Sequence, residues 1–389
     1  MNNKILSDFE RLFKNEKNYY KKRIQSEYPD PSLIFRKKKP VLIFGAARMG
    51  RVFLSNLKRE GISVLGFIDN NKKIQGSKID GVKIISLREA QSKYRLYPVL
   101  IASLLYETEI YNLLRKANFK NIYPLVYLNL IRPDIFVSPE YHNTFNSLFL
   151  NKNQKNILTL FALLNDKKSE KVFSNLLKFR LTTEKIYINK AESPKKLFFE
   201  KDVMPLSNNE VFIDCGAYDG DSVENFIKSV SGKFTKIYSF EPDKENFKKL
   251  NEKIKKNAWE NVVTIKKGVF NKNGKVGFHG AGTVDARIST KESVESVKST
   301  IDVVTIDNYF KDKEPPTLIK MDIEGAEIEA LLGAKKTIKK HKPKLAISSY
   351  HRSTDLWEIP LIIKSINKDY KIYFRHYSNE LPDTICYAI

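Results

Sequence analysis

Short apolar runs alternate with amphipathic stretches through residues 40–127. The runs "PVLIF", "SVLGFI" and "PVLIAS" have the length of buried strands, and helical periodicity follows in the segments between them. Two shorter runs, "VKII" and "NIYPL", add further strands, and Ser86 with Glu89 forms a capping box that begins a helix. Alternating βαβ units imply a parallel sheet with helices on both faces, so we expect a small Rossmann-like domain here.

The same alternation returns in residues 210–389. Strand patterns occur in "EVFIDCG", "KIYSFEP", "VVTIKKGVF", "TLIKMDIEG" and "KLAISSY", and helical patterns lie between most of them. The sequence "NKNG" after the third run is a hairpin signal. Two β segments, "YKIYFRHYS" and "TICYAI", close the chain. We therefore predict an α/β protein with two Rossmann-like doubly wound domains, the second of which ends in a β-hairpin.

The remaining residues lack this alternation. Residues 1–39 form a predicted N-terminal helical extension, which begins at the capping box of Ser7 and Glu10. Residues 128–209 contain apolar residues at helical spacing followed by an irregular, basic and aromatic segment. We interpret this part as a helical connector that covers the second domain's site.

Composition narrows the class of protein. No apolar run approaches the roughly 18 residues that span a bilayer, and the polar N-terminus does not resemble a secretory signal. We therefore expect a cytoplasmic location. Cys215 and Cys386 are too few and too far apart for a disulfide framework or a cysteine metal cluster. The net charge of +23 points to acidic partners, but its lysines are spread along the chain, so it is weak evidence for nucleic-acid binding.

In an open α/β sheet, ligands bind beyond the carboxyl ends of the strands. After the strand "EVFIDC" come two glycines, Gly216 and Gly220, which permit close approach of a ligand, and Asp221 or Ser222, which can begin the next helix. The amides at that helix start are a candidate carboxylate site. Asp214 suits an ammonium or sulfonium group.

Glu241 stands at the end of the next strand, where an acid accepts hydrogen bonds from ribose hydroxyls. A ligand with a ribose and a charged amino-acid-like arm fits these residues, and S-adenosylmethionine (SAM) is the simplest candidate. The alternative is that Asp214 only caps a turn and Glu241 is a surface acid. The predicted cofactor-binding residues are Asp214, Gly216, Tyr218, Gly220, Asp221, Ser222, Glu241, Gly268 and Asp322.

Five motifs in this order resemble those of FkbM-type SAM-dependent methyltransferases. They are "VFIDCGAYDGDS", "SFEPD", "VTIDNYF", "IKMDIEGAE" and "YHRSTDLWEIP", and the resemblance covers about residues 210–389. It implies a SAM-methyltransferase fold and O-methyl transfer to hydroxyls of sugars, natural products or surface glycans. Base N-methyltransferases usually carry an Asn/Asp-Pro-Pro-aromatic loop after the fourth strand, whereas Pro315 and Pro316 precede that strand here.

Methyl transfer to a hydroxyl requires removal of a proton by a His, a carboxylate or a metal-activated site. The predicted catalytic residues at the strand ends are Asp322, which orients the acceptor, and His351 or His376, which acts as the base. The alternative is that both histidines only hold loops in place. No spacing resembles a dedicated metal motif, so no metal is predicted.

Glu324, Arg352 and Arg375 are the predicted substrate-binding residues. The arginines suit a phosphate or carboxylate, or they pair with acids of the fourth-strand loop. Glu327 and Glu329 fall on the first turn of the following helix, where the helix dipole favours carboxylates without any catalytic role. Only the acids before that helix are expected to carry chemistry.

The first domain carries a partial nucleotide-binding pattern. Gly45 and Gly50 are the outer glycines of G-x-G-x-x-G, but Ala47 replaces the middle one, which disfavours a dinucleotide. Arg48 is a candidate phosphate contact and Asp69 a candidate ribose contact. The segment resembles small Rossmann-type domains of nucleotide-sugar enzymes such as sugar acetyltransferases. Binding of a nucleotide-linked sugar and a docking or homodimerisation role stay open as alternatives.

The leading hypothesis is a SAM-dependent O-methyltransferase whose substrate is a sugar, nucleotide sugar or glycan intermediate. One alternative is a nucleic-acid (RNA) methyltransferase, motivated by the net charge of +23. The other is a non-catalytic protein whose first domain senses a nucleotide.

Overall fold

The computed structural model describes residues 28–103, 106–136, 147–182, 184–193, 198–279, 287–288, 299–379 and 381–389. The predicted helix that begins at Ser7 and Glu10 lies outside the described residues. The chain forms two compact units, one of Met1–Gln154 with Leu177–Tyr187 and one of Lys155–Leu176 with Ile188–Ile389. The predicted connector is therefore divided between the units.

The first unit contains a six-stranded sheet in the order β3-β4-β2-β1-β5-β6. Neighbouring strands are parallel except for β3 and β4. The strands are β1 Val41–Phe44, β2 Val64–Ile68, β3 Lys78–Ile79, β4 Val82–Ile85, β5 Val99–Ile101 and β6 Ile122–Tyr123. The parallel order on both sides of β1 agrees with the predicted doubly wound sheet.

Both faces of this sheet are covered, which explains why β1 is apolar at every position. Ile43 belongs to one apolar cluster with Phe53, and Leu42 belongs to another with Leu114. Successive residues of a strand point to opposite faces, so β1 serves both clusters. The helices are α2 Ser32–Lys37, α3 Arg48–Arg59, α4 Leu87–Tyr94, α5 Glu107–Lys116, α6 Leu125–Ile131, α7 Pro133–Phe136 and α8 Ser147–Lys152. The helices α9 Gln154–Leu163, α10 Lys167–Thr182 and α11 Lys185–Ala191 follow.

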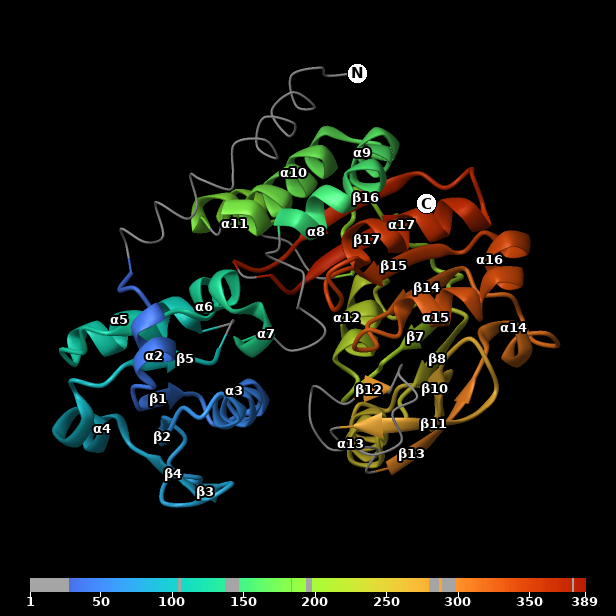
Figure 1. Ribbon diagram of the computed structural model, residues 1–389. Coiled ribbons are helices and arrows are strands. Elements are labelled where there is room, and N and C mark those ends of the chain that lie inside the picture. The colour runs from blue at the N-terminus through green and yellow to red at the C-terminus, as the bar shows by residue number, and fades with distance from the viewer. Residues whose placement is uncertain are drawn as a thin grey trace. The chain divides into compact units, whose positions relative to one another are not determined.

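The second unit contains a seven-stranded sheet in the order β16-β17-β15-β14-β7-β8-β9 (Figure 1). The five strands β15, β14, β7, β8 and β9 are mutually parallel. Strand β17 runs antiparallel to its two neighbours, β15 and β16. The strands are β7 Val211–Cys215, β8 Lys236–Phe240, β9 Val262–Ile265, β14 Leu318–Met321, β15 Lys344–Ser348, β16 Ile372–His376 and β17 Thr384–Ala388. The predicted doubly wound sheet with a terminal β-hairpin is confirmed.

The helices after the strands of this unit are α12 Asp221–Ser229, α13 Lys244–Lys256, α14 Ile306–Tyr309, α15 Glu327–Leu332, α16 Lys335–His341 and α17 Asp355–Ile366. The unit also includes Lys155–Leu176, which spans most of α9 and part of α10. One apolar cluster joins Phe212, Phe226 and Leu318, from β7, α12 and β14. Because such burial fixes the strands next to one another, it also fixes the positions of their carboxyl ends.

A second, four-stranded sheet has the order β10-β13-β11-β12. Its strands are β10 Gly268–Val269, β11 Gly274–His279, β12 Arg287–Ile288 and β13 Ser299–Val304. The "NKNG" segment connects β10 to β11, but β13 lies between these two strands. The predicted hairpin is therefore wrong, because β10 pairs in parallel with β13 instead.

Within the described residues, no helix combines the length and the apolar character that crossing a membrane requires.

Candidate active site

Most of the predicted site residues of the second unit lie at or just after the carboxyl ends of β7, β8, β14 and β15; Gly268, Arg375 and His376 lie elsewhere. These four strands are adjacent and parallel, so their carboxyl ends meet at one edge of the sheet. A ligand is expected at this edge in an open α/β sheet.

The turn after β7 packs closely against the backbone of the loop after β14. Gly216 has φ of +80°, and a Cβ at this position would lie 1.9 Å from the backbone oxygen of Asp322. No other residue fits there without movement of the backbone. Tyr218 also has a positive φ, 47°, and its amide donates a 2.9 Å hydrogen bond to Oε2 of Glu241. The turn is thus held between two neighbouring strand ends.

Glu241 is a buried carboxylate that keeps capacity for further hydrogen bonds. Its Oε1 accepts from the amide of Asp243, at 2.9 Å, in addition to the bond from Tyr218. Burial raises the pKa of Glu241 to about 7, although the two amide donors favour its charged form. A carboxylate has about four acceptor positions, so two are available for ribose hydroxyls.

The carboxylate of Asp214 is paired with a cation of the chain itself, whereas the sequence pattern predicted that it faces an ammonium or sulfonium group of a ligand. Its Oδ1 lies 3.0 Å from Nζ of Lys320, and its Oδ2 accepts a 2.6 Å hydrogen bond from the Ser222 hydroxyl. Asp214 and Lys320 are register partners on β7 and β14. Burial opposes the charge of Lys320, but the Asp214 carboxylate raises the pKa of this lysine to about 12. The ion pair links the two central strands.

The first backbone amides of α12 donate hydrogen bonds to side chains of the same segment. Asp219 accepts from the amide of Asp221 at 3.2 Å, and Asp221 accepts from the amide of Ser222 at 2.7 Å. Gly220, with φ of +88°, precedes the helix. These contacts occupy amides that the sequence suggested as a carboxylate site.

The loops after β14 and β15 bring a histidine among carboxylates. His351 is only 5% exposed. Its Nε2 lies 3.6 Å from Oδ1 of Asp322 and 3.5 Å from Oε2 of Glu324. Its Nδ1 lies 3.0 Å from Oε1 of Glu327. The hydroxyl of Tyr350 donates a 3.2 Å hydrogen bond to Asp322.

These carboxylates decide the charge of His351. Burial alone would lower its pKa, but the charges of Glu327 and Glu324 raise the pKa of His351 to about 10. At neutral pH the imidazole therefore holds its proton, which disfavours its predicted role as base in this state. Ligand atoms of Asp322, Glu324 and His351 all lie within 4.8 Å of one another, a separation that suits a metal ion.

Arg352 and Asp355 hold the same loop. Arg352 lies 2.9 Å from Oε2 of Glu329, so it pairs with an acid of helix α15 instead of an acid of the fourth-strand loop itself. Oδ2 of Asp355 accepts from the amide of Arg352 at 2.6 Å. Burial, and then the charge of Glu327, raises the pKa of Asp355 to about 7.

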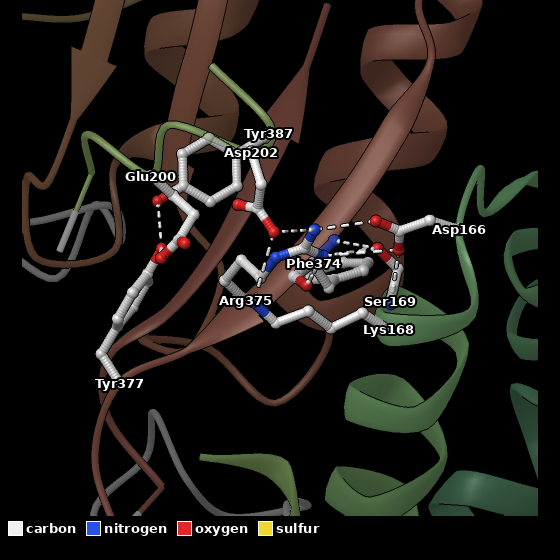
Figure 2. A network of polar contacts seen from close by, with 9 residues as sticks. All are labelled: Asp166, Lys168, Ser169, Glu200, Asp202, Phe374, Arg375, Tyr377 and Tyr387. Carbon is white, nitrogen blue, oxygen red and sulfur yellow. Dashed lines mark hydrogen bonds and ion pairs between the residues drawn. The ribbon is translucent and has the colours of Figure 1, made fainter. Parts of the chain in front are cut away.

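Arg375 lies in a buried polar network on β16 (Figure 2). Its Nη2 is 2.7 Å from Asp166 and 3.3 Å from Asp202, and its Nη1 donates to the Ser169 hydroxyl at 3.2 Å. The guanidinium is thus engaged by acids of the chain itself, which favours a structural role over substrate binding.

Two further predicted residues lie away from the histidine cluster. His376 is on β16, two strands beyond β15, where its Nδ1 lies 2.8 Å from the Thr384 hydroxyl. Gly268 is in β10 and pairs with Val303 of β13, in the smaller sheet. Neither position brings these residues into the contacts described for His351.

The predicted nucleotide site of the first unit has the geometry of a glycine turn. Gly45 has φ of +106°, and a Cβ on Gly50 would lie 2.0 Å from the oxygen of Gly45. Asp69 accepts from the amide of Ala46 at 2.9 Å, so its carboxylate holds the turn. Arg48 is exposed at the start of α3.

Sequence reasoning missed Lys320, Glu327 and Asp355 as members of the site. For Lys320 a signal exists, because a charge inside an apolar strand needs a buried partner. Glu327 and Asp355 lie on first helical turns, where acids are common for local reasons. Their contacts with the His351 loop depend on how β14 and β15 pair.

Family models match two parts of the chain. The Methyltransferase FkbM domain matches residues 214–373, and the model described as C2185-like, N-terminal, matches residues 37–122. No curated protein sequence matches the chain.

Among solved structures, the chain is similar to methyltransferase FkbM from Methylobacillus flagellatus KT. The identity is 24%, the TM-score is 0.74, and 99% of each chain is covered. A putative methyltransferase from Streptococcus mutans in complex with SAH has 15% identity and a TM-score of 0.30, over 49% of this chain and 93% of the other. UDP-D-quinovosamine 4-dehydrogenase from Vibrio fischeri has 27% identity and a TM-score of 0.19, over 22% of this chain and 75% of the other. The first of these similarities supports the fold of both units.

Proposed function

We propose that the chain is a SAM-dependent methyltransferase of the FkbM type, which the match of residues 214–373 to the FkbM domain supports. We further propose that it transfers a methyl group to a hydroxyl of a sugar, nucleotide sugar or glycan intermediate. The observation that carries the proposal is the meeting of the Gly216 turn, Glu241 and Asp322 at one sheet edge. The turn meets the backbone of Asp322, and its Tyr218 amide contacts Glu241. This meeting supports a cofactor site and an acceptor site that are adjacent.

The residues of this edge fit SAM. Glu241 accepts hydrogen bonds from the ribose hydroxyls through the lone pairs that the amides of Tyr218 and Asp243 leave available. Gly216 and Gly220 provide the close backbone approach, since a side chain at Gly216 would meet Asp322. When bound, SAM supplies the methyl group, and its sulfur keeps the electron pair of the broken bond.

Asp322 is the proton acceptor that the contacts favour. It follows β14 directly, it is half-buried, and its Oδ1 accepts a hydrogen bond from the Tyr350 hydroxyl. The acceptor hydroxyl donates its proton to this carboxylate as its oxygen forms the new bond to the methyl carbon. His351 and His376 remain the predicted alternatives for the base.

The proposed function is tested by incubation of the chain with SAM and a panel of nucleotide sugars and glycans, followed by mass spectrometry. We expect an acceptor to gain one methyl group. Asp322→Asn should lower turnover by about 100-fold or more while SAM binding changes little. Exposed His341→Gln is the matched control.

Two outcomes would contradict the proposal or its details. Methylation of RNA instead of any sugar would favour the alternative that the charge of +23 motivates. Full activity of Asp322→Asn together with loss in His351→Ala or His376→Ala would return the base role to the histidines.

A further inference from the structure

The acidic cluster around His351 has the geometry of an ion site. Nε2 of His351 lies 3.6 Å from Asp322 and 3.5 Å from Glu324. Ligand atoms that share a four-coordinate ion at about 2.1 Å lie about 3.4 Å apart. The two observed separations are close to that spacing and too long for hydrogen bonds.

A second observation indicates where Nε2 points. His351 is more than nine-tenths buried, and its Nε2 has no hydrogen-bond partner. The other ring nitrogen, Nδ1, also forms no hydrogen bond, but it lies 3.0 Å from the buried carboxylate of Glu327. Histidine ligands of metals usually turn their second ring nitrogen toward a carboxylate, which orients the ring with Nε2 as the ligand.

The cluster also contains more carboxylates than the one imidazole can neutralise. Asp322, Glu324 and Glu327 surround one imidazole, and the nearby Arg352 is paired with Glu329. Asp322 and Glu324 are partly exposed, whereas Glu327 is buried. A divalent ion beside these carboxylates would be the largest local charge and would attract all three of them.

We propose that Asp322, Glu324 and Nε2 of His351 bind one divalent transition-metal ion, with Glu327 as the positioning residue that holds Nδ1. Two carboxylates and one imidazole suit Mn²⁺ or Zn²⁺ and leave coordination positions open for a substrate oxygen. The residues come from the loops after β14 and β15, which is why no local metal motif occurs in the sequence.

The role of the ion deepens the proposed function and rests on it. An ion held by these residues would bind the oxygen of the acceptor hydroxyl and make its proton more acidic. Asp322 would accept that proton at Oδ2, and the oxygen would bond to the methyl carbon as the carbon–sulfur bond breaks. The neutral Nε2 of His351 is then a ligand and no base.

Binding is tested without SAM or acceptor, so that it does not depend on the activity. The full chain, freed of metal with a chelator, is titrated with Mn²⁺ and Zn²⁺ by calorimetry, and the Mn²⁺ complex is studied by electron spin-echo spectroscopy. We expect one ion per chain and a coupling to one imidazole nitrogen. Binding of Mn²⁺ without nitrogen coupling, or absence of binding at millimolar metal, would overturn the proposal.

Four variants locate the ion. Glu324→Gln and His351→Gln should weaken Mn²⁺ binding by at least about tenfold, and His351→Gln should remove the nitrogen coupling. Glu327→Gln should weaken binding by about 10–100-fold while the coupling persists at saturating Mn²⁺. His341→Gln, which changes an exposed histidine, should bind as the unchanged chain does. Circular dichroism confirms that each variant folds; equal affinity in folded Glu324→Gln would refute the assignment.

The catalytic role has a separate readout. If an acceptor is methylated, removal of the metal should abolish turnover while binding of SAH persists, and Mn²⁺ should restore it. Unchanged turnover without metal would overturn the role of the ion. Metal binding without methylation of any acceptor would contradict the proposed function and leave the ion site supported.

Discussion

At the scale of single residues, Glu241 makes the proposed cofactor site sensitive to pH. It is 6% exposed, and two backbone amides donate to it. Burial raises the pKa of its carboxyl to about 7, so that it is largely protonated below this pH. A protonated carboxyl offers fewer acceptor lone pairs to ribose hydroxyls than a carboxylate does.

We predict that SAH binding weakens as the pH falls below about 7. Because ribose binding favours the charged form, the affinity should fall by up to about tenfold for each pH unit below 7. Calorimetric titration with SAH between pH 5.5 and 8 measures this. Glu241→Gln should bind SAH weakly with no such dependence, and exposed Glu245→Gln should behave as the unchanged chain. A flat profile of the unchanged chain would contradict the ribose role of Glu241.

At the scale of elements, the pairing of β7 with β14 includes a buried charge pair. Asp214 and Lys320 are register partners, and the lysine also donates to the carbonyl oxygen of Gly216 at 2.8 Å. This contact ties the glycine turn to the strand that leads to Asp322. The pair therefore links strand pairing to the geometry of the site.

Lys320→Met should lower the free energy of unfolding by about 3–5 kcal/mol, because it leaves Asp214 buried without its partner. Denaturant unfolding followed by circular dichroism measures the loss. Lys228→Met is the matched control, since it removes an exposed pair with Glu224 and should cost less than about 1 kcal/mol. The double variant Lys320→Met with Asp214→Asn should be less destabilised than Lys320→Met alone. Equal losses for Lys320→Met and Lys228→Met would show that the buried pair contributes no more than a surface pair.

At the scale of the whole molecule, the chain divides into two units with separate apolar clusters. Ile43 and Phe53 belong to a cluster of the first unit, and Phe212 and Phe226 belong to one of the second. A ligand that binds one folded unit stabilises that unit by mass action.

We expect calorimetry to resolve two unfolding transitions. SAH should raise the midpoint temperature of only one of them. At 100 times its dissociation constant, SAH should add about 2.7 kcal/mol to the stability of the second unit. Phe53→Ala creates a cavity in the first unit. It should lower the midpoint temperature of the other transition and leave that of the SAH-dependent transition unchanged. A single transition that SAH shifts as a whole would mean that the units unfold together.

The sequence alone determined the class of fold and the strand ends at which the site is proposed. Continuous apolar runs predict strands buried on both faces, and apolar residues at helical spacing predict the helices between them. Because strands covered by helices on both faces must be apolar, this alternation predicts parallel sheets. The positions of Gly216 and Glu241 after successive strands follow from the same pattern. The smaller sheet was not predictable, because β10 pairs with β13, which is distant in the sequence.

Only the tertiary structure decided which charges meet. The carboxylate of Asp214 faces Lys320, Arg375 is held by Asp166, and Glu327 turns toward His351. Each of these pairs joins residues from different elements, so its distance depends on strand register and loop geometry, which local periodicity does not encode. A charge visible in the sequence is therefore a candidate for chemistry until the fold supplies its partner, since burial makes the unpaired state costly.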